Sequence, residues 1–240
     1  MDRTRRAALL TGVLFLVTIV ASIPGALLYT PLLTDPGYIT GPGADTQIAL
    51  GALLEIIVGI ANIGTAVVLF PIVRRQSEGI ALAYVASRIA ESVLIAVGIL
   101  SLLSVVTLRQ QFAADSTGDP GSLVVVGAAL VAVHGWTFLL GPGLLAGFGN
   151  GLLLGYLMYR SGLVPRPMAL VGLIGGPIVF LSGIAVLFGL YTQASGWSAL
   201  ATLPEVVWEA FLGIYLLGKG FRPSPIIAEP VGTGTVPQSA

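Results

Sequence analysis

The sequence has no cysteine and a single histidine in a chain of 240 residues. The absence of cysteine excludes disulfides, thiol nucleophiles and thiolate metal sites. One histidine cannot supply bis-histidine haem ligation, and no HExxH, GxSxG or Walker A motif occurs. We therefore expect no metal site and no bound cofactor.

Charged residues are also scarce, and their signs are balanced. They make up 9% of the chain, against about 25% in a typical soluble domain. Eleven basic and eleven acidic residues give a formal net charge of zero, so there is no basic surface for nucleic acid. Hydrophobic residues make up 55%, and the mean hydropathy is +0.96. This composition predicts an all-α, polytopic helical membrane protein in contact with the lipid bilayer.

Apolar runs long enough to cross a bilayer recur along the chain. We predict about six membrane-spanning helices, at 7–29, 49–73, 80–106, 136–159, 168–190 and 204–218. The start, MDRTRRAALLTGVLFLVTIV, resembles a signal peptide, but no clear A-x-A cleavage site follows its long apolar part, so we interpret it as a retained first helix. We expect one transmembrane helical domain over 1–222 and a disordered cytoplasmic tail over 223–240, which is rich in Pro and Gly.

One apolar stretch, 123–159, is too long for a single span at about 1.5 Å per residue across about 30 Å of hydrocarbon. Reading it as two spans would move the basic residues that follow it to the outer side. We therefore predict that 123–134 is a short interfacial or re-entrant helix on the outer side. Trp136 then marks the membrane interface where the fourth span begins.

Basic residues indicate the orientation, because they concentrate in cytoplasmic loops. Nine of them fall on one side if both termini are cytoplasmic: Arg3, Arg5, Arg6, Arg74, Arg75, Arg160, Arg166, Lys219 and Arg222. The other side receives Arg109 and four aspartates, Asp35, Asp45, Asp115 and Asp119. We therefore expect both termini to be cytoplasmic.

Two opposite charges, Arg88 and Glu91, lie in the middle of the third predicted span. A charge at mid-membrane costs roughly 2.5–3.5 kcal/mol on insertion scales, so such residues face protein or water, usually with a partner. These two are three residues apart and share a helix face, so they can pair. An ion pair that only locks helices together is an equally good interpretation.

Further polar residues join this pair in one candidate site for a ligand or protons. The site consists of Glu55, Asn62, Arg88, Glu91, His134, Asn150 and Glu209. We expect a cavity that opens to the outer side, with Arg88 as its floor. Because one arginine cannot neutralise all the carboxylates, the excess must be protonated, hydrated or paired with a ligand cation.

Each residue of the site has an expected role and a simpler alternative. Glu55, Glu91 and Glu209 would accept the ligand or proton, Asn62 and Asn150 would orient it, and His134 would gate the outer mouth. The structural alternatives are snorkelling interface residues for Glu55 and Glu209, and a capping role for His134. Glu205, near the predicted start of the last span, lies with Glu55, His134 and Glu209 in the outer half of the membrane, and its simpler alternative is a position at the surface.

Glycine recurs every four residues in the fourth predicted span, at Gly143, Gly147, Gly151 and Gly155. Such a stripe lets a neighbouring helix approach closely, so we expect helix packing there, within one chain or in a homodimer. The sequence Gly141-Pro142-Gly143 predicts a break or kink nearby.

Three stretches, HGWTFLLGPG (134–143), GYLMYRSGLVPR (155–166) and LGKGF (217–221), occur in an order that resembles a bacterial family of small integral membrane proteins, domain of unknown function 4386. The likeness covers residues 5 to 222, and its middle block is the most specific. It implies a multi-span helical protein of a prokaryotic plasma membrane. It implies no established activity and therefore no catalytic residues.

The leading hypothesis is a non-enzymatic membrane protein whose intramembrane polar site binds or transports a small polar or cationic ligand, or protons. A second hypothesis is an accessory or sensor subunit whose buried charges are purely structural and which binds a membrane partner protein. A third is a lipid-modifying enzyme that uses glutamate and histidine as acid and base, but the sequence lacks a recognisable nucleophile.

Overall fold

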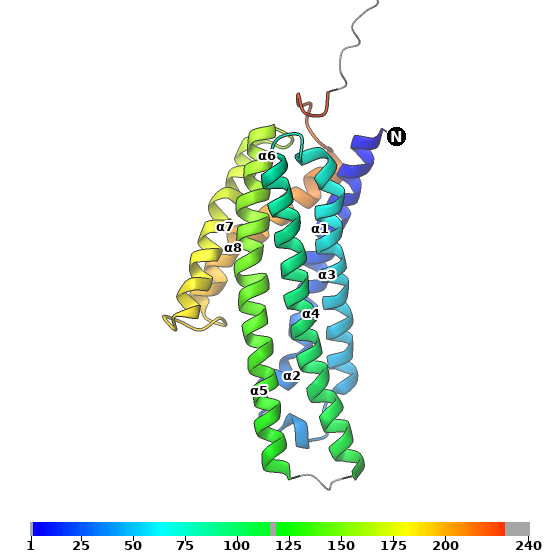
Figure 1. Ribbon diagram of the computed structural model, residues 1–240, viewed down its shortest axis with the longest axis vertical. Coiled ribbons are helices and arrows are strands. Elements are labelled where there is room, and N and C mark those ends of the chain that lie inside the picture. Colours follow the sequence, from blue (N-terminus) through cyan, green and yellow to red (C-terminus); the bar gives the residue numbers. More distant parts are fainter. Residues whose placement is uncertain (1, 116–118, 229–240) are drawn as a thin grey trace, which may run out of the picture.

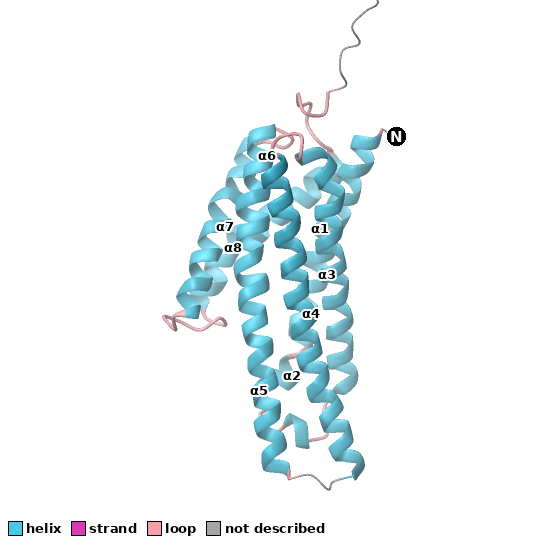
Figure 2. Cartoon of the chain, viewed as in Figure 1, coloured by secondary structure: helices cyan, strands magenta, loops and turns pink. Residues whose placement is uncertain are grey.

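The computed structural model describes residues 2–115 and 119–228. This part of the chain is built from helices and short loops, with no strand in it (Figure 2). In chain order the elements are α1 (Arg3–Leu28), α2 (Thr30–Thr34), η1 (Tyr38–Thr40), α3 (Asp45–Val73), α4 (Glu78–Asp115), α5 (Pro120–Phe138), η2 (Leu139–Leu145), η3 (Gly147–Leu154), α6 (Gly155–Ser161), α7 (Arg166–Leu187) and α8 (Gly196–Gly218).

Six helices are long and apolar enough to cross a membrane, which confirms the predicted fold class. One of them is the continuous run from α5 to α6, which we call the long helix. Each helix packs against the next in the order α1, α3, α4, long helix, α7 and α8, and α8 returns to α1. The six helices therefore form a closed ring, and the polar side chains described below lie inside it.

Both ends of the described chain lie at the same end of the bundle (Figure 1). The Arg5 guanidinium donates to the carbonyl oxygens of Leu216 and Leu217 at 3.2 and 2.9 Å, so the start of α1 is fastened to the end of α8. We call this the basic end. At the opposite, distal end, Arg109 of α4 forms an ion pair with Asp45 of α3, with 2.7 Å between Nε and Oδ1.

The prediction of a separate interfacial or re-entrant helix at 123–134 is wrong. These residues belong to the long helix, which runs unbroken over 42 residues from Pro120 to Ser161. Asp119 caps its start, because its carboxylate accepts a hydrogen bond from the Ser122 backbone at 2.8 Å. A helix longer than the hydrocarbon need not break, since it can project beyond it, as α4 and α5 project beyond the α7–α8 hairpin (Figure 1). The short helix outside the six spans is α2.

Two further boundaries differ from the predicted ones. The last helix begins at Gly196 rather than at 204, because the Ser195 hydroxyl caps it and accepts from the Ser198 backbone at 3.2 Å. The break expected at Gly141-Pro142-Gly143 is a change of helix type. Residues 139–145 and 147–154 are π-helical, which accommodates a proline that has no N–H to donate.

The first residues of the predicted disordered tail pack against the basic end. The Ser224 hydroxyl donates to the Ser161 carbonyl at 2.5 Å, and the Ile226 carbonyl accepts from the Arg75 guanidinium at 3.1 Å. Residues 229–240 of that tail lie outside the described residues.

The glycine stripe of the long helix faces α7 of the same chain. A Cβ on Gly147 would lie 2.7 Å from the Gly176 carbonyl oxygen, and one on Gly155 would lie 3.0 Å from the Leu173 nitrogen. Gly151 also faces Gly176, whereas Gly143 faces its own helix. Because α7 occupies the stripe, it is closed to a second copy of the chain.

Candidate functional site

The centre of the ring holds a closed triangle of polar side chains from α3 and α4. Arg88 Nη1 donates to Glu91 Oε2 at 2.7 Å, and Arg88 Nη2 donates to Asn62 Oδ1. The Asn62 amide completes the triangle by donating to Glu91 Oε1 at 3.1 Å. All three side chains are buried. The predicted Arg88–Glu91 pair therefore forms, and Asn62 bridges it.

A second group of side chains joins η3 and α8 to this triangle. The Asn150 amide donates to Glu209 Oε1, and the Asn150 backbone carbonyl accepts from Trp208 Nε1 at 3.1 Å. The Tyr84 hydroxyl lies 3.5 Å from Asn150 Oδ1 and 3.4 Å from Thr65 Oγ1. We call the whole set the core network: Asn62, Thr65, Tyr84, Arg88, Glu91, Asn150, Glu205, Trp208 and Glu209.

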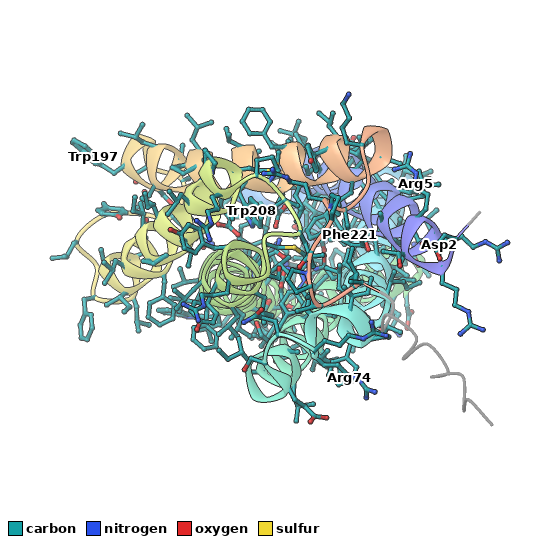
Figure 3. The ribbon with its side chains drawn as sticks, turned by 90° about the horizontal axis from the view of Figure 1, so that it is seen from above. Asp2, Arg5, Arg74, Trp197, Trp208 and Phe221 are labelled. Carbon is teal, nitrogen blue, oxygen red and sulfur yellow. The ribbon has the colours of Figure 1, made fainter. Side chains whose placement is uncertain are left out.

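Helical spacing explains how the network assembles. Tyr84, Arg88 and Glu91 are separated by four and three residues, so they share the inner face of α4. On α8, Trp208 and Glu209 lie three and four residues after Glu205, so these three side chains also share one face. Figure 3 shows Trp208 in the interior, whereas Trp197 of the same helix points outward at the edge.

The π-helical part of the long helix brings its backbone into the network. The Leu145 carbonyl in η2 accepts from the Ser87 hydroxyl at 3.2 Å. The glycines of η3 leave room for side chains from other helices, because Gly149 faces Ser87 and Gly151 faces the Glu205 carboxyl. π-Helical turns occur frequently at functional sites.

Glu205 is buried, which excludes the alternative that it reaches the surface. Its side chain is 4% exposed, and within the described part of the chain neither carboxylate oxygen has a hydrogen-bond partner. Pro204 and Gly175 pack beside its backbone. The guanidinium of Arg88 interacts electrostatically with the carboxyls of Glu91, Glu205 and Glu209. Two buried carboxyl groups, of Glu91 and Glu205, and the half-buried one of Glu209 therefore share the positive charge of one arginine.

Glu55 and His134 lie in a separate place, between α1, α3 and α5. Glu55 Oε2 accepts from the Tyr29 hydroxyl at 3.0 Å. The Tyr29 ring stands edge-on to His134, with 5.5 Å between the ring centroids, and Phe138 follows at 6.3 Å from His134. Among the described residues, no hydrogen bond connects Glu55 or His134 to the core network. The seven residues of the predicted site therefore fall into two groups, Glu55 with His134 and the other five in the core network.

The Glu55 group lines a pocket of about 310 Å³, which we call the outer pocket. It is bounded by Ala26, Tyr29, Leu33, Glu55, Val131, His134, Gly135, Phe138, Gln193 and Ala194. A neighbouring pocket of about 410 Å³ lies between η2, α7 and α8 and shares Phe138, Gln193 and Ala194 with it. Thr202 and Val206 line this second pocket, and Glu205 lies between them in the sequence. The second pocket thus approaches the core network from the distal side.

The predicted site did not include five residues of these groups: Tyr29, Thr65, Tyr84, Glu205 and Trp208. Tyr84 carried a signal, because it lies one turn before Arg88 on the same face. Tyr29 follows α1 and Glu55 lies in α3, so no spacing within one helix relates the two residues. In the described ranges, no three His, Asp or Glu side chains are grouped so as to hold a metal ion.

Residues 10–220 match the family described as Domain of unknown function (DUF4386). The match covers most of the chain, and the chain belongs to this family. No curated protein matches the chain, and no solved structure does.

Proposed function

We propose that this member of the domain of unknown function 4386 family takes up and releases protons at carboxyl groups buried within the membrane. The observation that carries the proposal is the set of Glu91, Glu205 and Glu209 around one guanidinium, that of Arg88. If all four groups were ionised, the centre of the bundle would carry one positive and three negative charges. An uncompensated carboxylate is very costly in such surroundings, so two of the three carboxyls hold protons.

The hydrogen bonds indicate which carboxyls carry the exchangeable protons. Both oxygens of Glu91 accept hydrogen bonds, from Arg88 and Asn62, which suits an ionised carboxylate. Glu209 accepts from Asn150, and Glu205 has no partner for either oxygen among the described residues. Glu205 and Glu209 are one helical turn apart. If one of them is ionised, its negative charge opposes ionisation of the other, so at least one of the two tends to hold a proton. We assign the exchangeable protons to this pair.

The second pocket supplies the route by which protons reach the pair. Its polar lining includes the hydroxyls of Ser182, Ser198 and Thr202, and Thr202 lies one helical turn from Glu205. Hydroxyl groups both donate and accept hydrogen bonds, so they can hold water next to a carboxyl. The core network itself is closely packed, and a proton suits it better than an organic ligand does.

The location that we propose is a prokaryotic plasma membrane, with both termini in the cytoplasm. The support is the gathering of basic residues at the basic end, since such residues favour the cytoplasmic side. In this orientation the second pocket and the outer pocket face outward.

A structural clamp is a second candidate role for the core network. The closure of Arg88 on both Glu91 and Asn62 favours it, because this arrangement ties α3 to α4 without any ligand. The protein would then be an accessory subunit of a membrane partner. The two roles differ in one measurable respect, which is whether Glu205 and Glu209 exchange protons.

Infrared difference spectroscopy of the purified full chain over a pH titration tests the proposal. A protonated carboxyl has a C=O stretching band that disappears when the proton leaves. We expect bands that titrate with pH and that are lost separately in Glu205→Gln and Glu209→Gln. Glu55→Gln identifies the band of the outer pocket, and Glu78→Gln, which changes an exposed carboxyl at the start of α4, leaves the buried bands unchanged.

The clamp role gives a different result in the same experiment. If no band titrates, or if every titrating band survives in both the Glu205→Gln and Glu209→Gln variants, the proton-binding proposal is wrong. The remaining role of the network would then be to hold the helices together, and loss of folding in Arg88→Gln would support that role.

A further inference from the structure

The outer pocket has the features of a binding site for a small organic cation. It holds the carboxyl group of Glu55, which ionises when a cation is bound, three aromatic rings and the amide of Gln193, and the rest of its lining is aliphatic or glycine. A volume of about 310 Å³ lies within the usual range for small-molecule sites. Neither Lys nor Arg occurs among the described residues that line it.

The carboxyl group of Glu55 is held in place by a hydrogen bond, but it has no positively charged partner among the described residues. The Tyr29 hydroxyl holds Oε2 at 3.0 Å, which fixes the carboxylate relative to the pocket. Within the described chain, Oε1 accepts no hydrogen bond, and Arg88 and Arg109 form their ion pairs with other acids. His134 lies in the same pocket but forms no ion pair with Glu55 in this part of the chain. A ligand cation would therefore complete the site.

The aromatic rings favour an ammonium group over a metal ion. A cation within about 6 Å of an aromatic ring is attracted to its face, and the attraction grows when water is excluded. Tyr29, His134 and Phe138 follow one another at centroid distances of 5.5 and 6.3 Å along one side of the pocket. A metal ion needs several oxygen or nitrogen ligands, and Glu55 and His134 are the strong ligands that the lining provides.

We propose that the outer pocket binds the ammonium group of a small organic amine, with Glu55 as its counter-ion, Tyr29 as the residue that positions the carboxylate, and Phe138 and His134 as aromatic walls. The proposal does not depend on proton exchange in the core network, because no hydrogen bond among the described residues links the two sites. The ammonium can belong to a free amine or to an aminophospholipid headgroup. The same chemistry recognises both.

The test is calorimetric titration of the full chain in dodecyl maltoside micelles, which contain no ammonium. Phenethylamine, a cation at pH 7, and 2-phenylethanol, its neutral analogue, are the two probes. We expect the amine to bind and the alcohol to bind much more weakly. Glu55→Gln should weaken amine binding by about tenfold or more, because a charge-assisted contact is lost. Tyr29→Phe should weaken it by less, and Glu78→Gln should leave it unchanged.

Three results would overturn the proposal: no heat of binding with the amine, equal affinity for amine and alcohol, or an unchanged affinity in Glu55→Gln. If Glu55→Gln does not fold, which its thermal unfolding reports, Tyr29→Phe decides instead, and an unchanged affinity there overturns the proposal. Added phosphatidylethanolamine separates the two sources of the ammonium. If phosphatidylethanolamine competes with phenethylamine and phosphatidylglycerol does not, the pocket binds a lipid headgroup. If phosphatidylethanolamine does not compete, the pocket binds a free amine.

Discussion

Asn150 donates a hydrogen bond from its side chain to the carboxyl of Glu209, and its backbone carbonyl accepts one from the neighbouring Trp208. A single residue of η3 thus holds α8 at two points. Tyr84 approaches the same side chain from α4. The long helix is therefore tied to both of these helices at the level of the core network.

Replacement of Asn150 by leucine should loosen this junction. The substitution keeps the approximate size of the side chain but removes the partner of Glu209. We expect a loss of about 1–3 kcal/mol of stability, the usual cost of a buried polar group left without a partner. Unfolding in detergent micelles measures it. A variant as stable as the wild type would show that Glu209 does not depend on Asn150.

Removal of the Arg88 charge should be more severe. Arg88→Gln leaves Glu91 buried without its cation, and breaking a buried ion pair in this way costs about 3–5 kcal/mol. The double variant Arg88→Gln/Glu91→Gln removes both charges and should recover part of the loss. The coupling between the two substitutions comes from a double-mutant cycle of unfolding free energies. Strict additivity would contradict the ion pair.

The contact between the glycine stripe and α7 can be tested with a matched pair of alanine substitutions. Gly151→Ala places a methyl group against Gly176 and the Glu205 carboxyl, so the two helices must separate. Gly135→Ala, in the same long helix, meets nothing within 4 Å and should be neutral or gain up to about 1 kcal/mol from helix propensity. Thermal unfolding compares the two. Equal stability of both variants would argue against close packing on α7.

The hydrogen bonds and the ion pair of Arg109 hold the distal end together, and we expect their effect to be local. Besides pairing with Asp45, Arg109 donates from Nη1 to the carbonyl oxygens of Gly41 and Pro42 at 3.1 and 2.8 Å. Arg109→Gln should therefore increase hydrogen exchange in the segment that connects α2 to α3. The core network should stay protected, since it lies several helical turns away. Increased exchange throughout the bundle would mean that the distal end is needed for global stability.

The cap of the long helix should respond to acid. Hydrogen bonds from the Ser122 hydroxyl and from the Ser122 and Gly121 backbones hold the pKa of Asp119 below its usual range. Its contribution is therefore present above the ordinary carboxyl pKa of about 4 and is lost as the pH falls through the lower folded-state value. The protection factors of amides 121–124 should fall in that window. Asp119→Asn also caps helices but does not titrate, so its protection should not follow the pH.

The sequence predicted the pairing within α4 but not the meeting of different helices. Arg88 and Glu91 belong to one helix, so their separation of three residues fixes their geometry. Whether Glu55 and Glu91 share a cavity depends on how α3 and α4 are rotated about their axes, which the spacing within each helix does not determine. Both glutamates are buried, yet they lie in different sites.

The π-helical turns explain why the side chains of the long helix were difficult to place from the sequence. A π-helical turn contains more residues than an α-helical turn. An expectation based on 3.6 residues per turn therefore assigns the residues between Leu139 and Asn150 to the wrong face of the helix relative to His134. The turn signals at Gly141-Pro142-Gly143 indicated an irregularity without giving its kind. The surface alternative for Glu205 arose because the residues before Pro204 resembled a loop, although they form the first turns of α8.

The unequal lengths of the helices have a consequence for the surrounding lipid. α4 and the long helix have 38 and 42 residues, whereas α7 and α8 have 22 and 23. At 1.5 Å per residue, the first two are about 60 Å long and the last two about 35 Å, against about 30 Å of hydrocarbon. The bundle therefore meets the bilayer unevenly. Lipids beside the α7–α8 hairpin meet helices whose length matches the hydrocarbon, whereas α4 and α5 carry the distal end of the bundle beyond it, into the headgroup layer and the water.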